Sequence, residues 1–525
     1  MSKNPRSNRT LLFTTVLLLS FSALVPFAAS LAQDISGGSS SELASAADVE
    51  SKSGRGVFTA PKNLAHHAGR LERKTVARAT VTRTQRDTVA TTGRDHTQGR
   101  PADTTSNQTD PPLDSTRPLG DAARRVAGPE DLNKQGDEAF DAGNYEKAAE
   151  LYQKALKQKP NFPAARLNLS EAYFNLGKFA EAAAEAKQAI ALKPDWADAY
   201  AALGNAYIKL DKPQDAIEPL NKALQLESQN AEARAALSSI YYDRGVAAYN
   251  ANNYDQAIAE YKQAVATKPN YAEAFNNLGD AYRRQDKYAE AAEAYKQAVQ
   301  FRRDYVEAYS NLAWMYDKLG KYPEAAEAYR QVIRLKQDDA EANNNMGYAL
   351  GKSKRWSEAV APLKRAIELK PDYAEAYSNL GWVYNNLGKF NDAIEPLQKA
   401  AQLDPKLPEA YFNIGITYSK LKKNDDAVAA FKRAVDLKGD WPAAHNNLGF
   451  AFGSLGKWKE AIAEHQAAIR LKPDYAGAHF NLGVAYAVTG KKKDAEAEYK
   501  TLKPLSPGLA NQLYFVIYRK QPPAG

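Results

Sequence analysis

Asparagine recurs every 34 residues between positions 277 and 481, and its side chain is the first feature of the chain that could bind a ligand. The asparagine row consists of Asn168, Asn277, Asn311, Asn345, Asn379, Asn413, Asn447 and Asn481. A carboxamide carries an acceptor and a donor, so it can bond the N–H and the C=O of an extended peptide of any sequence. The row therefore predicts recognition of polypeptide backbone. The alternative is that each asparagine ties neighbouring helices together or faces water.

A second row, three positions after the asparagine row, changes from polar to apolar along the chain. It begins with Asp137, Glu171, Asn205 and Asp280 and continues as the apolar row, which is Trp314, Tyr348, Trp382, Ile416, Phe450 and Val484. The anchors of a binding groove are predicted to be Trp314, Tyr348, Trp382 and Phe450, because a few large aromatic side chains carry most of the energy of an interface. The competing interpretation is that adjacent helices touch through this row, which would make it core.

The residues around these rows predict two helices in every 34-residue unit. In one unit the first helix shows the i, i+3, i+4, i+7 apolar stripe at Tyr377, Leu380, Gly381 and Tyr384. Gly388 ends this helix, since glycine adopts the left-handed conformation of a helix cap. A second stripe starts at Phe390, and Pro405 stops it. The unit is therefore a pair of antiparallel helices.

The order of small, aromatic, alanine and proline residues resembles the tetratricopeptide repeat family over residues 129–507, in about eleven copies. The resemblance implies an all-α, right-handed superhelix, an α-solenoid whose first helices line a concave groove. The asparagine row resembles the asparagine ladder in the repeat domain of O-linked N-acetylglucosamine transferase, which implies binding of extended polypeptide. The resemblance stops at the repeats, so no glycosyl transfer is expected.

One interval in the array is longer than the others. Gly204 and Gly245 are 41 residues apart instead of 34, and the excess lies near residues 238–244. Seven residues make nearly two helical turns, so the insertion can lengthen a first helix without rotating its apolar stripe away from the core. The sequence predicts one long helix from about Ala231 to Asn250.

The segments that flank the array predict export. Residues 1–32 combine basic residues, an apolar run and a small-residue cleavage site, which is typical of a signal peptide; an uncleaved membrane anchor is the alternative. Residues 33–128 are rich in Ser, Thr, Gly, Pro and Arg and predict a disordered tether, basic between 52 and 100. The expected location is periplasmic or secreted, or membrane-anchored and facing outside if the leader is retained.

The last segment, residues 508–525, predicts a capping helix and a tail. Its residues 513–518 are apolar on all sides, whereas a cap normally shows water a polar face. This composition favours a contact between two copies of the chain or a docking helix.

Composition and motifs exclude several classes of function. The chain has no cysteine, which excludes disulfides and thiol chemistry. The array is nearly neutral, so nucleic acid is not an expected partner. Metal-protease, nucleophile-elbow and dinucleotide motifs are missing, so neither enzymatic activity nor a cofactor is expected. Three histidines, His445, His465 and His479, stand where the repeats carry packing aromatics, and no metal site is predicted from them.

These features together predict an exported protein–protein interaction scaffold that binds extended polypeptide in its groove and serves assembly in the cell envelope. Two alternatives remain open. The aromatic side chains could stack on sugar rings of a glycan or envelope polymer. A retained leader would instead make the chain a membrane-anchored subunit of a secretion or pilus system.

Overall fold

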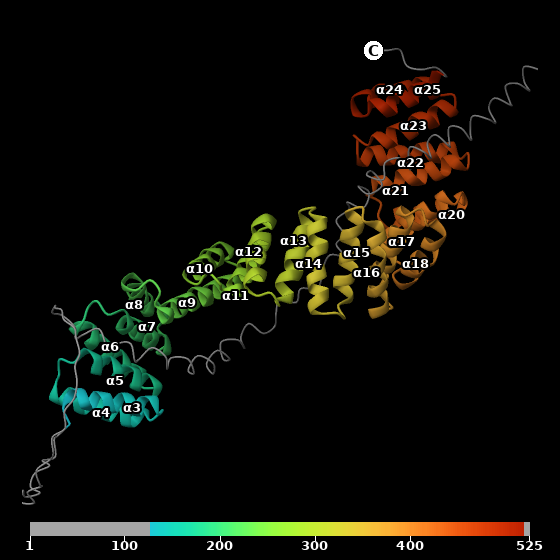
Figure 1. Ribbon diagram of the computed structural model, residues 1–525. Helices are drawn as coiled ribbons and strands as arrows, with labels where there is room; N and C mark the ends of the chain where they lie inside the picture. The colour runs from blue at the N-terminus through green and yellow to red at the C-terminus, as the bar shows by residue number, and fades with distance from the viewer. Residues whose placement is uncertain (1–126, 519–525) are drawn as a thin grey trace, which may run out of the picture. The chain divides into compact units, whose positions relative to one another are not determined.

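The computed structural model describes residues 127–518, and this part of the chain consists of α-helices joined by short turns (Figure 1). The described residues contain 23 helices, α3 to α25, and no strand. The expected signal peptide, tether and C-terminal tail after residue 518 lie outside the described residues. No helix within residues 127–518 combines the length and the apolar character that crossing a bilayer requires.

The chain forms two compact units, one ending at Gln285 and the other beginning at Asp286. The first unit contains α3 (Pro129–Asp141), α4 (Tyr145–Gln158), α5 (Pro163–Asn175), α6 (Phe179–Leu192), α7 (Ala197–Lys209), α8 (Pro213–Leu226), α9 (Ala231–Asn250), α10 (Tyr254–Thr267) and α11 (Ala272–Arg284). Here α3 packs on α4, α5 on α6, α7 on α8 and α9 on α10. The expected helix pairs are therefore present.

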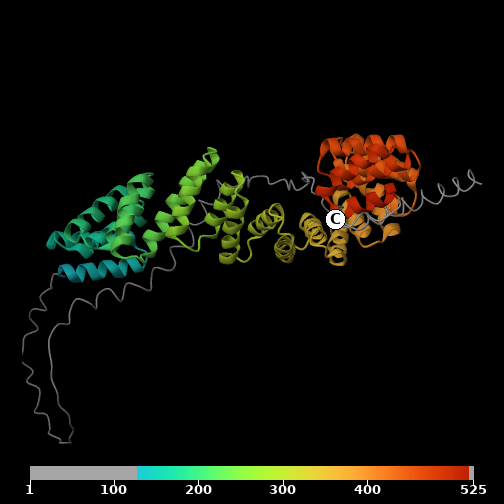
Figure 2. The same ribbon diagram turned by 90° about the horizontal axis from the view of Figure 1, so that it is seen from above.

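The second unit repeats the same arrangement. It contains α12 (Tyr288–Phe301), α13 (Val306–Lys318), α14 (Tyr322–Leu335), α15 (Ala340–Lys352), α16 (Trp356–Leu369), α17 (Ala374–Asn386), α18 (Phe390–Leu403), α19 (Pro408–Lys420), α20 (Asn424–Leu437), α21 (Pro442–Ser454), α22 (Trp458–Leu471), α23 (Ala476–Val488), α24 (Lys492–Leu505) and α25 (Pro507–Tyr518). Each pair also contacts the next pair along the chain (Figure 2).

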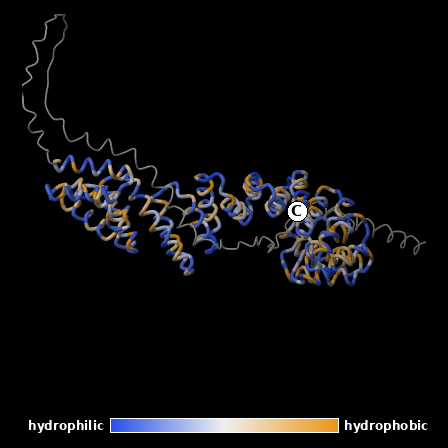
Figure 3. Tube along the Cα trace, turned by 90° about the horizontal axis from the view of Figure 1, so that it is seen from below, coloured by the Kyte–Doolittle hydropathy of each residue, from blue (hydrophilic) through white to orange (hydrophobic). Residues whose placement is uncertain are grey.

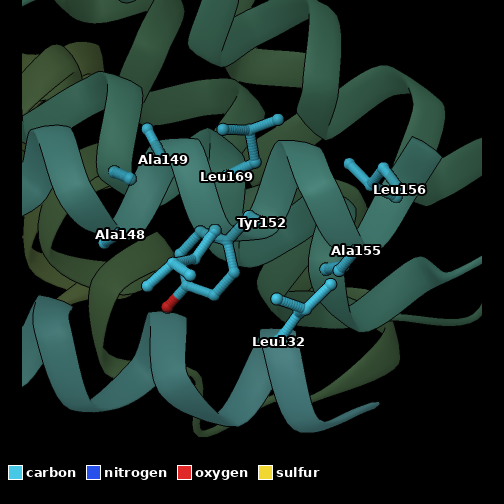
Figure 4. Close-up of a cluster of buried hydrophobic side chains, with 10 residues drawn as sticks. Leu132, Ala148, Ala149, Tyr152, Ala155, Leu156 and Leu169 are labelled. Carbon is cyan, nitrogen blue, oxygen red and sulfur yellow. The ribbon is translucent and has the colours of Figure 1, made fainter. Parts of the chain in front are cut away.

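A small residue at each helix crossing determines how closely the two helices of a pair approach. A Cβ placed on Gly136 would lie only 2.4 Å from the ring of Tyr152, and one placed on Gly381 would lie 2.3 Å from Leu397. Figure 4 shows Tyr152 inside the cluster of the first pair, beside Leu132 and Ala155. The hydropathy of the trace alternates along the helices in keeping with one buried face and one exposed face on most of them (Figure 3).

The turn within a pair follows the expected chemistry. Gly388, which follows the C-cap residue Leu387 of α17, has φ of 72°. This left-handed conformation costs glycine little, and it lets the chain reverse between α17 and α18. The predicted helix stop at Gly388 is confirmed.

The long interval produces a long helix. The helix α9 spans Ala231–Asn250 and has 20 residues, whereas its neighbours α7 and α11 have 13 each. At 1.5 Å per residue, α9 is about 10 Å longer than those first helices. The prediction of one continuous helix over this range is confirmed.

The last helix completes the core of the last pair. In α23, a Cβ on Gly483 would meet Leu513 of α25 at 2.4 Å, whereas the corresponding glycines of earlier pairs meet a residue of their own second helix. Tyr499 of α24 instead pairs with Tyr514 of α25, with ring centroids 5.4 Å apart. The helix α25 therefore covers the end of the array, as expected of a cap, while its role between two copies of the chain stays a prediction.

Candidate functional site: a groove along α9

The structure contains an open groove of about 950 Å³ along the long helix of the first unit. One side is α9, and the other side comes from α5, the turn into α6, α7 and the start of α8. Outside α9 the lining residues are Phe174, Asn175, Gly177, Phe179, Asn205, Ile208, Lys209 and Pro213. The groove is therefore bounded by three successive first helices, which is the face on which the repeat resemblance places a ligand.

The helix α9 contributes one continuous face to this groove. Its lining residues are Glu232, Ala235, Ala236, Ser239, Ile240, Asp243, Arg244 and Ala247. Successive members are spaced by one, three or four residues, so they share one side of the helix over about four turns. Small side chains at three of these positions leave room beside the helix. The last five members, from Ser239 onward, lie in or beyond the inserted segment, so the insertion extends the groove.

The groove wall is apolar along most of its length. Phe174 and Phe179 pack edge to face with ring centroids 5.4 Å apart, and both line the groove where α5 gives way to α6. Ile208 lines it from α7, and Ile240 of α9, which is 4% exposed, adds a small apolar surface next to the core. An aliphatic or aromatic side chain of a ligand would lose contact with water here, which is worth about 1.5 to 3 kcal/mol for a fully buried residue.

Four charged residues lie among these apolar side chains. The Arg244 guanidinium pairs with Glu260 of α10, with Nη2 and Oε1 2.5 Å apart. Burial raises the pKa of Asp243, although a hydrogen bond from the Ser239 hydroxyl acts in the opposite direction. Lys209 and Glu232 make further interactions within the chain. The groove thus combines apolar surface with a carboxylate that is partly withdrawn from water.

Sequence reasoning identified the long helix but did not assign a binding site to it. The signal was available in the spacing, because Ala236, Ser239, Asp243 and Ala247 already form a helical stripe of small and acidic residues. What could not be predicted was that α5 and α7 would leave this stripe uncovered. The amino-acid sequence alone does not show which face of a helix is covered by the neighbouring helices.

The asparagine row is engaged inside the fold at several positions. The amide nitrogen of Asn379 donates to Asn344 Oδ1 at 2.9 Å, and that of Asn481 donates to Asn446 Oδ1 at 3.0 Å. Asn277 donates to the Tyr242 hydroxyl at 3.0 Å. The amide of Asn168 donates to Asp137 at 2.9 Å. Each of these bonds joins one first helix to the first helix of the preceding pair.

These asparagines satisfy polar groups that the helix pairs bury between them. Asn277 and Asn345 hydrogen-bond the hydroxyls of the buried residues Tyr261 and Tyr329. In α20 the position of these tyrosines is taken by Phe431, which has no hydroxyl. The amide of Asn447 there donates to the Ala443 carbonyl of its own helix, 2.8 Å away. A buried hydroxyl without a partner costs roughly 1 to 3 kcal/mol, which is the physical reason for the asparagines.

The interpretation of the row as a free ladder of amides is therefore corrected. Asn168, Asn277, Asn379 and Asn481 use their donors to tie neighbouring helices, and Asn311 and Asn413 are 5% and 8% exposed. Asn345 accepts a hydrogen bond from Asn344 at 3.1 Å. The alternative interpretation, a tie between helices, describes these residues. Binding of a peptide backbone by the row stays a prediction.

Side chains of the apolar row also pack against neighbouring helices. Trp382 is only 8% exposed, and its ring packs against those of Tyr348 and Trp356, with centroids 5.8 and 5.0 Å away. The Cβ position of Gly351 lies 2.5 Å from the same indole, so the glycine makes room for it. The expectation that Trp382 anchors a partner is wrong, because its ring is buried between consecutive pairs.

The other three expected anchors are half-buried. Phe450 packs against the cluster of Phe480 and Val484, which belong to the next first helix. Tyr348 contacts Trp382 as described, and Trp314 lies under the Lys318 ammonium, 5.7 Å from the ring centroid. The competing interpretation, contact between adjacent first helices, holds for Tyr348, Trp382 and Phe450. Partner binding by Trp314 stays a prediction.

The three histidines have local partners rather than a common site. His445 and His479 lie 2.6 Å from Glu464 and Glu498, each through Nδ1. The pKa of His445 is raised, chiefly by its hydrogen bond to Glu464. Burial lowers the pKa of His465 to about 3, and its Nδ1 lies 3.0 Å from Asn446 Oδ1. Among the described residues, no group of three or more acidic or histidine side chains could hold a metal ion.

Comparison with solved structures finds helical repeat proteins whose TM-scores against this chain are low. Yeast Tom70 is 16% identical with a TM-score of 0.35, covering 74% of this chain and 94% of its own. YrrB, described as a TPR protein with an unusual peptide-binding site, is 25% identical with a TM-score of 0.32, covering 36% and 98%. MamA is 31% identical with a TM-score of 0.29, covering 31% and 95%. No curated protein sequence matches the chain.

Family models match along the array. Models described as tetratricopeptide repeat match residues 139–206, 197–230, 242–306 and 408–440. A model described as TPR repeat matches residues 315–354, 352–388, 383–422 and 452–490. These segments make up more than half of the sequence and fall on the helix pairs described above. The chain belongs to the tetratricopeptide repeat family, whose arrays are typically non-catalytic scaffolds for protein–protein interaction.

Proposed function

We propose that this scaffold binds an extended segment of a partner polypeptide in the groove along α9. The observation that carries the proposal is the uncovered face of α9, which faces α5 and α7 across an apolar groove. An extended chain advances about 3.3 Å per residue, so the roughly 22 Å between the lining residues Glu232 and Ala247 can accompany about seven residues of a ligand. Side chains of the ligand enter the groove while its backbone remains near water.

Affinity arises mainly from apolar side chains in this proposal. Ordering a flexible ligand costs roughly 2 to 5 kcal/mol, and one buried apolar residue contributes about 1.5 to 3 kcal/mol. A single apolar side chain is therefore insufficient for stable capture. The ligand needs a second apolar residue or a charged contact in the same groove.

A blocking substitution tests the proposal directly. Ala235 is exposed and lines the groove, so Ala235→Trp fills it, whereas Ala259→Trp adds the same ring to an exposed position of α10 outside the lining. Random twelve-residue peptides displayed on phage are selected against the full chain and both variants. We expect enrichment with the unmodified chain and Ala259→Trp, and none with Ala235→Trp. Equal enrichment with all three proteins rejects the groove as the site.

We further propose that the scaffold acts outside the cytoplasm, in assembly of the cell envelope. The support is the pattern of residues 1–32, with its basic start, apolar run and small-residue cleavage site. N-terminal sequencing of the protein from its native host tests this proposal. A mature chain beginning near residue 33 supports export with cleavage. A chain that retains the leader and fractionates with membranes supports the anchored alternative, and a soluble cytoplasmic chain with the leader rejects export.

A further inference from the structure

Among the charged side chains that line the groove, Asp243 is the best placed to bind a positively charged group of a ligand. It lies on the groove face of α9, within one turn of Ile240 and of Ala247. Its side chain remains accessible, yet the surrounding protein removes enough water to raise its pKa. A partly desolvated carboxylate gains more from a cation than a fully hydrated one does, because the local dielectric is lower.

The influences that act on Asp243 come from burial and from the Ser239 hydroxyl, and neither is a cation. The nearest arginine in the sequence, Arg244, is paired with Glu260, which is 7% exposed. Glu232 adds a second carboxylate to α9, and Lys209 of α7 is the cation on the facing wall. Because Arg244 is already paired with Glu260, it does not neutralise Asp243, whose carboxylate lines the groove.

We propose that the α9 groove selects a partner segment in which a lysine or arginine lies two residues from a large apolar residue, with the cation at Asp243 and the apolar side chain against Ile240. This inference rests on the proposed function and specifies its ligand. In an extended chain, residues i and i+2 point to the same side about 6.6 Å apart. Positions 240 and 243 of α9 are about 4.5 Å apart along the axis, which suits that spacing.

The charge of the ligand compensates for the limited apolar contact. Asp243 is exposed, so water screens its pairing with a cation, and the pair should change affinity by about fivefold at most. This contribution adds to that of one apolar residue and brings the total closer to the cost of ordering the ligand. Asn205 of α7 and the Ser239 hydroxyl lie in the same groove and can orient the cation.

The proposal predicts a pH dependence with a defined sign. Protonation of Asp243 removes the charge that holds the cation, so affinity falls as the pH falls through a pKa raised above the ordinary range of aspartate. The other titratable and charged groups of the site are Glu232 and Arg244 on α9, Lys209 on α7 and Glu260 on α10, together with Tyr271 before α11, whose pKa is raised in part by Asp243. Asp243→Asn removes the Asp243 component and leaves the others.

Peptide selection with matched variants tests the inference. The phage library is selected against the full chain, Asp243→Asn and the control Asp195→Asn, which removes the same charge from an exposed turn. We expect basic and apolar residues two positions apart to be enriched with the full chain and the control, and the basic preference to disappear with Asp243→Asn. The selected lysine peptide and its glutamine twin are then measured by fluorescence anisotropy.

Each result of this experiment decides between the two proposals. In the anisotropy measurement, Asp243→Asn should weaken the lysine peptide about fivefold and the glutamine twin less than about twofold. Enrichment that Ala235→Trp abolishes but that shows no basic preference overturns the inference and leaves the proposed function standing. Enrichment of acidic peptides also overturns the inference. No enrichment above the Ala235→Trp variant overturns both.

Discussion

The two units of the array use equivalent faces of their first helices in opposite ways. In the first unit, Asn205 of α7 lines an open groove beside α9. In the second unit, the equivalent residue of α17 is Trp382, whose ring packs between Tyr348 and Trp356. A short polar side chain leaves the face open, and a large aromatic one fills it. The same helical repeat therefore leaves an open groove in one unit and forms a packed aromatic contact in the other.

The comparison also corrects a common inference from aromatic residues. Aromatic side chains on the face opposite the main packing stripe suggest an interface. In a solenoid, however, each first helix also packs against the first helices before and after it. That second contact accounts for the burial of Trp382, while the open groove lies where the row is polar. Burial between successive pairs decides whether an aromatic residue is an anchor or core.

The largest expected effect comes from removing the aromatic joint of the second unit. Trp382→Ala leaves a cavity beside Gly351 and should destabilise this unit by about 3 to 5 kcal/mol. Urea unfolding followed by circular dichroism measures the loss. Phe301→Ala is the control, because Phe301 is 43% exposed, and its effect should be much smaller. A nearly unchanged unfolding transition for Trp382→Ala would show that Trp382 is not core, and would favour the interpretation of this residue as an anchor for a partner.

The second prediction concerns acid stability, since the second unit contains the only histidines of residues 127–518. His465 has a pKa of about 3 in the folded chain, whereas an unfolded chain gives histidine its ordinary pKa of about 6.5. Because the unfolded state therefore binds the proton more readily, the free energy of unfolding is unaffected above about pH 6.5 and decreases as the pH falls towards 3. The upper bound is about 1.4 kcal/mol per pH unit. His465→Leu should flatten this acid loss, because leucine occupies the same place at Leu363 and Leu397. His445 acts in the opposite direction, since its raised pKa contributes stability at pH below about 6.5 that is lost at higher pH.

Thermal melts of the full chain between pH 4 and pH 7.5 measure this difference. The unmodified chain should lose its second-unit transition at a higher pH than His465→Leu does. An acid profile that the leucine variant does not alter would show that other groups control acid unfolding.

The third prediction tests the close approach that accommodates Trp382. In Gly351→Ala, the new methyl would lie 2.5 Å from the indole, so repacking should cost about 1 to 3 kcal/mol despite the better helix propensity of alanine. The matched control is Gly477→Ala in α23, where the new methyl meets Tyr475 at an ordinary 3.4 Å. That variant should be stabilised by up to about 1 kcal/mol. Equal effects of both changes on the urea midpoint would contradict the close contact between Gly351 and Trp382.

The smallest effect distinguishes two members of the asparagine row. Asn379→Ala removes a bond between first helices and should cost about 1 to 2 kcal/mol, because Asn344 loses a partner. Asn447→Ala removes only a bond to its own helix, so its effect should stay below about 0.5 kcal/mol. Denaturant midpoints of the two variants measure the difference. Identical losses would show that the tie between helices contributes no stability.

Much of the fold could be predicted from local pattern. The stripe around Gly381 predicts a helix, and α17 forms there; Gly388 predicts its end, and the chain reverses at that residue. The inserted residues 238–244 predict a longer helix, and α9 has 20 residues. These features depend on neighbours within one or two helical turns, which a sequence contains directly.

The candidate site could be predicted only in part. The sequence locates the first helices and so the face on which a groove could form, but it does not tell whether Asn379 meets water, a ligand or Asn344. The sequence alone determined the repeat, the helix pairs and the long α9. Only the tertiary structure decided that Trp382 is core, that four asparagines of the row tie neighbouring helices and that the face of α9 is open. Those outcomes depend on contacts between residues far apart in the sequence, such as the 26 positions between Trp356 and Trp382 and the 35 between Asn446 and Asn481. The energies of these contacts are set by the volume left between packed helices.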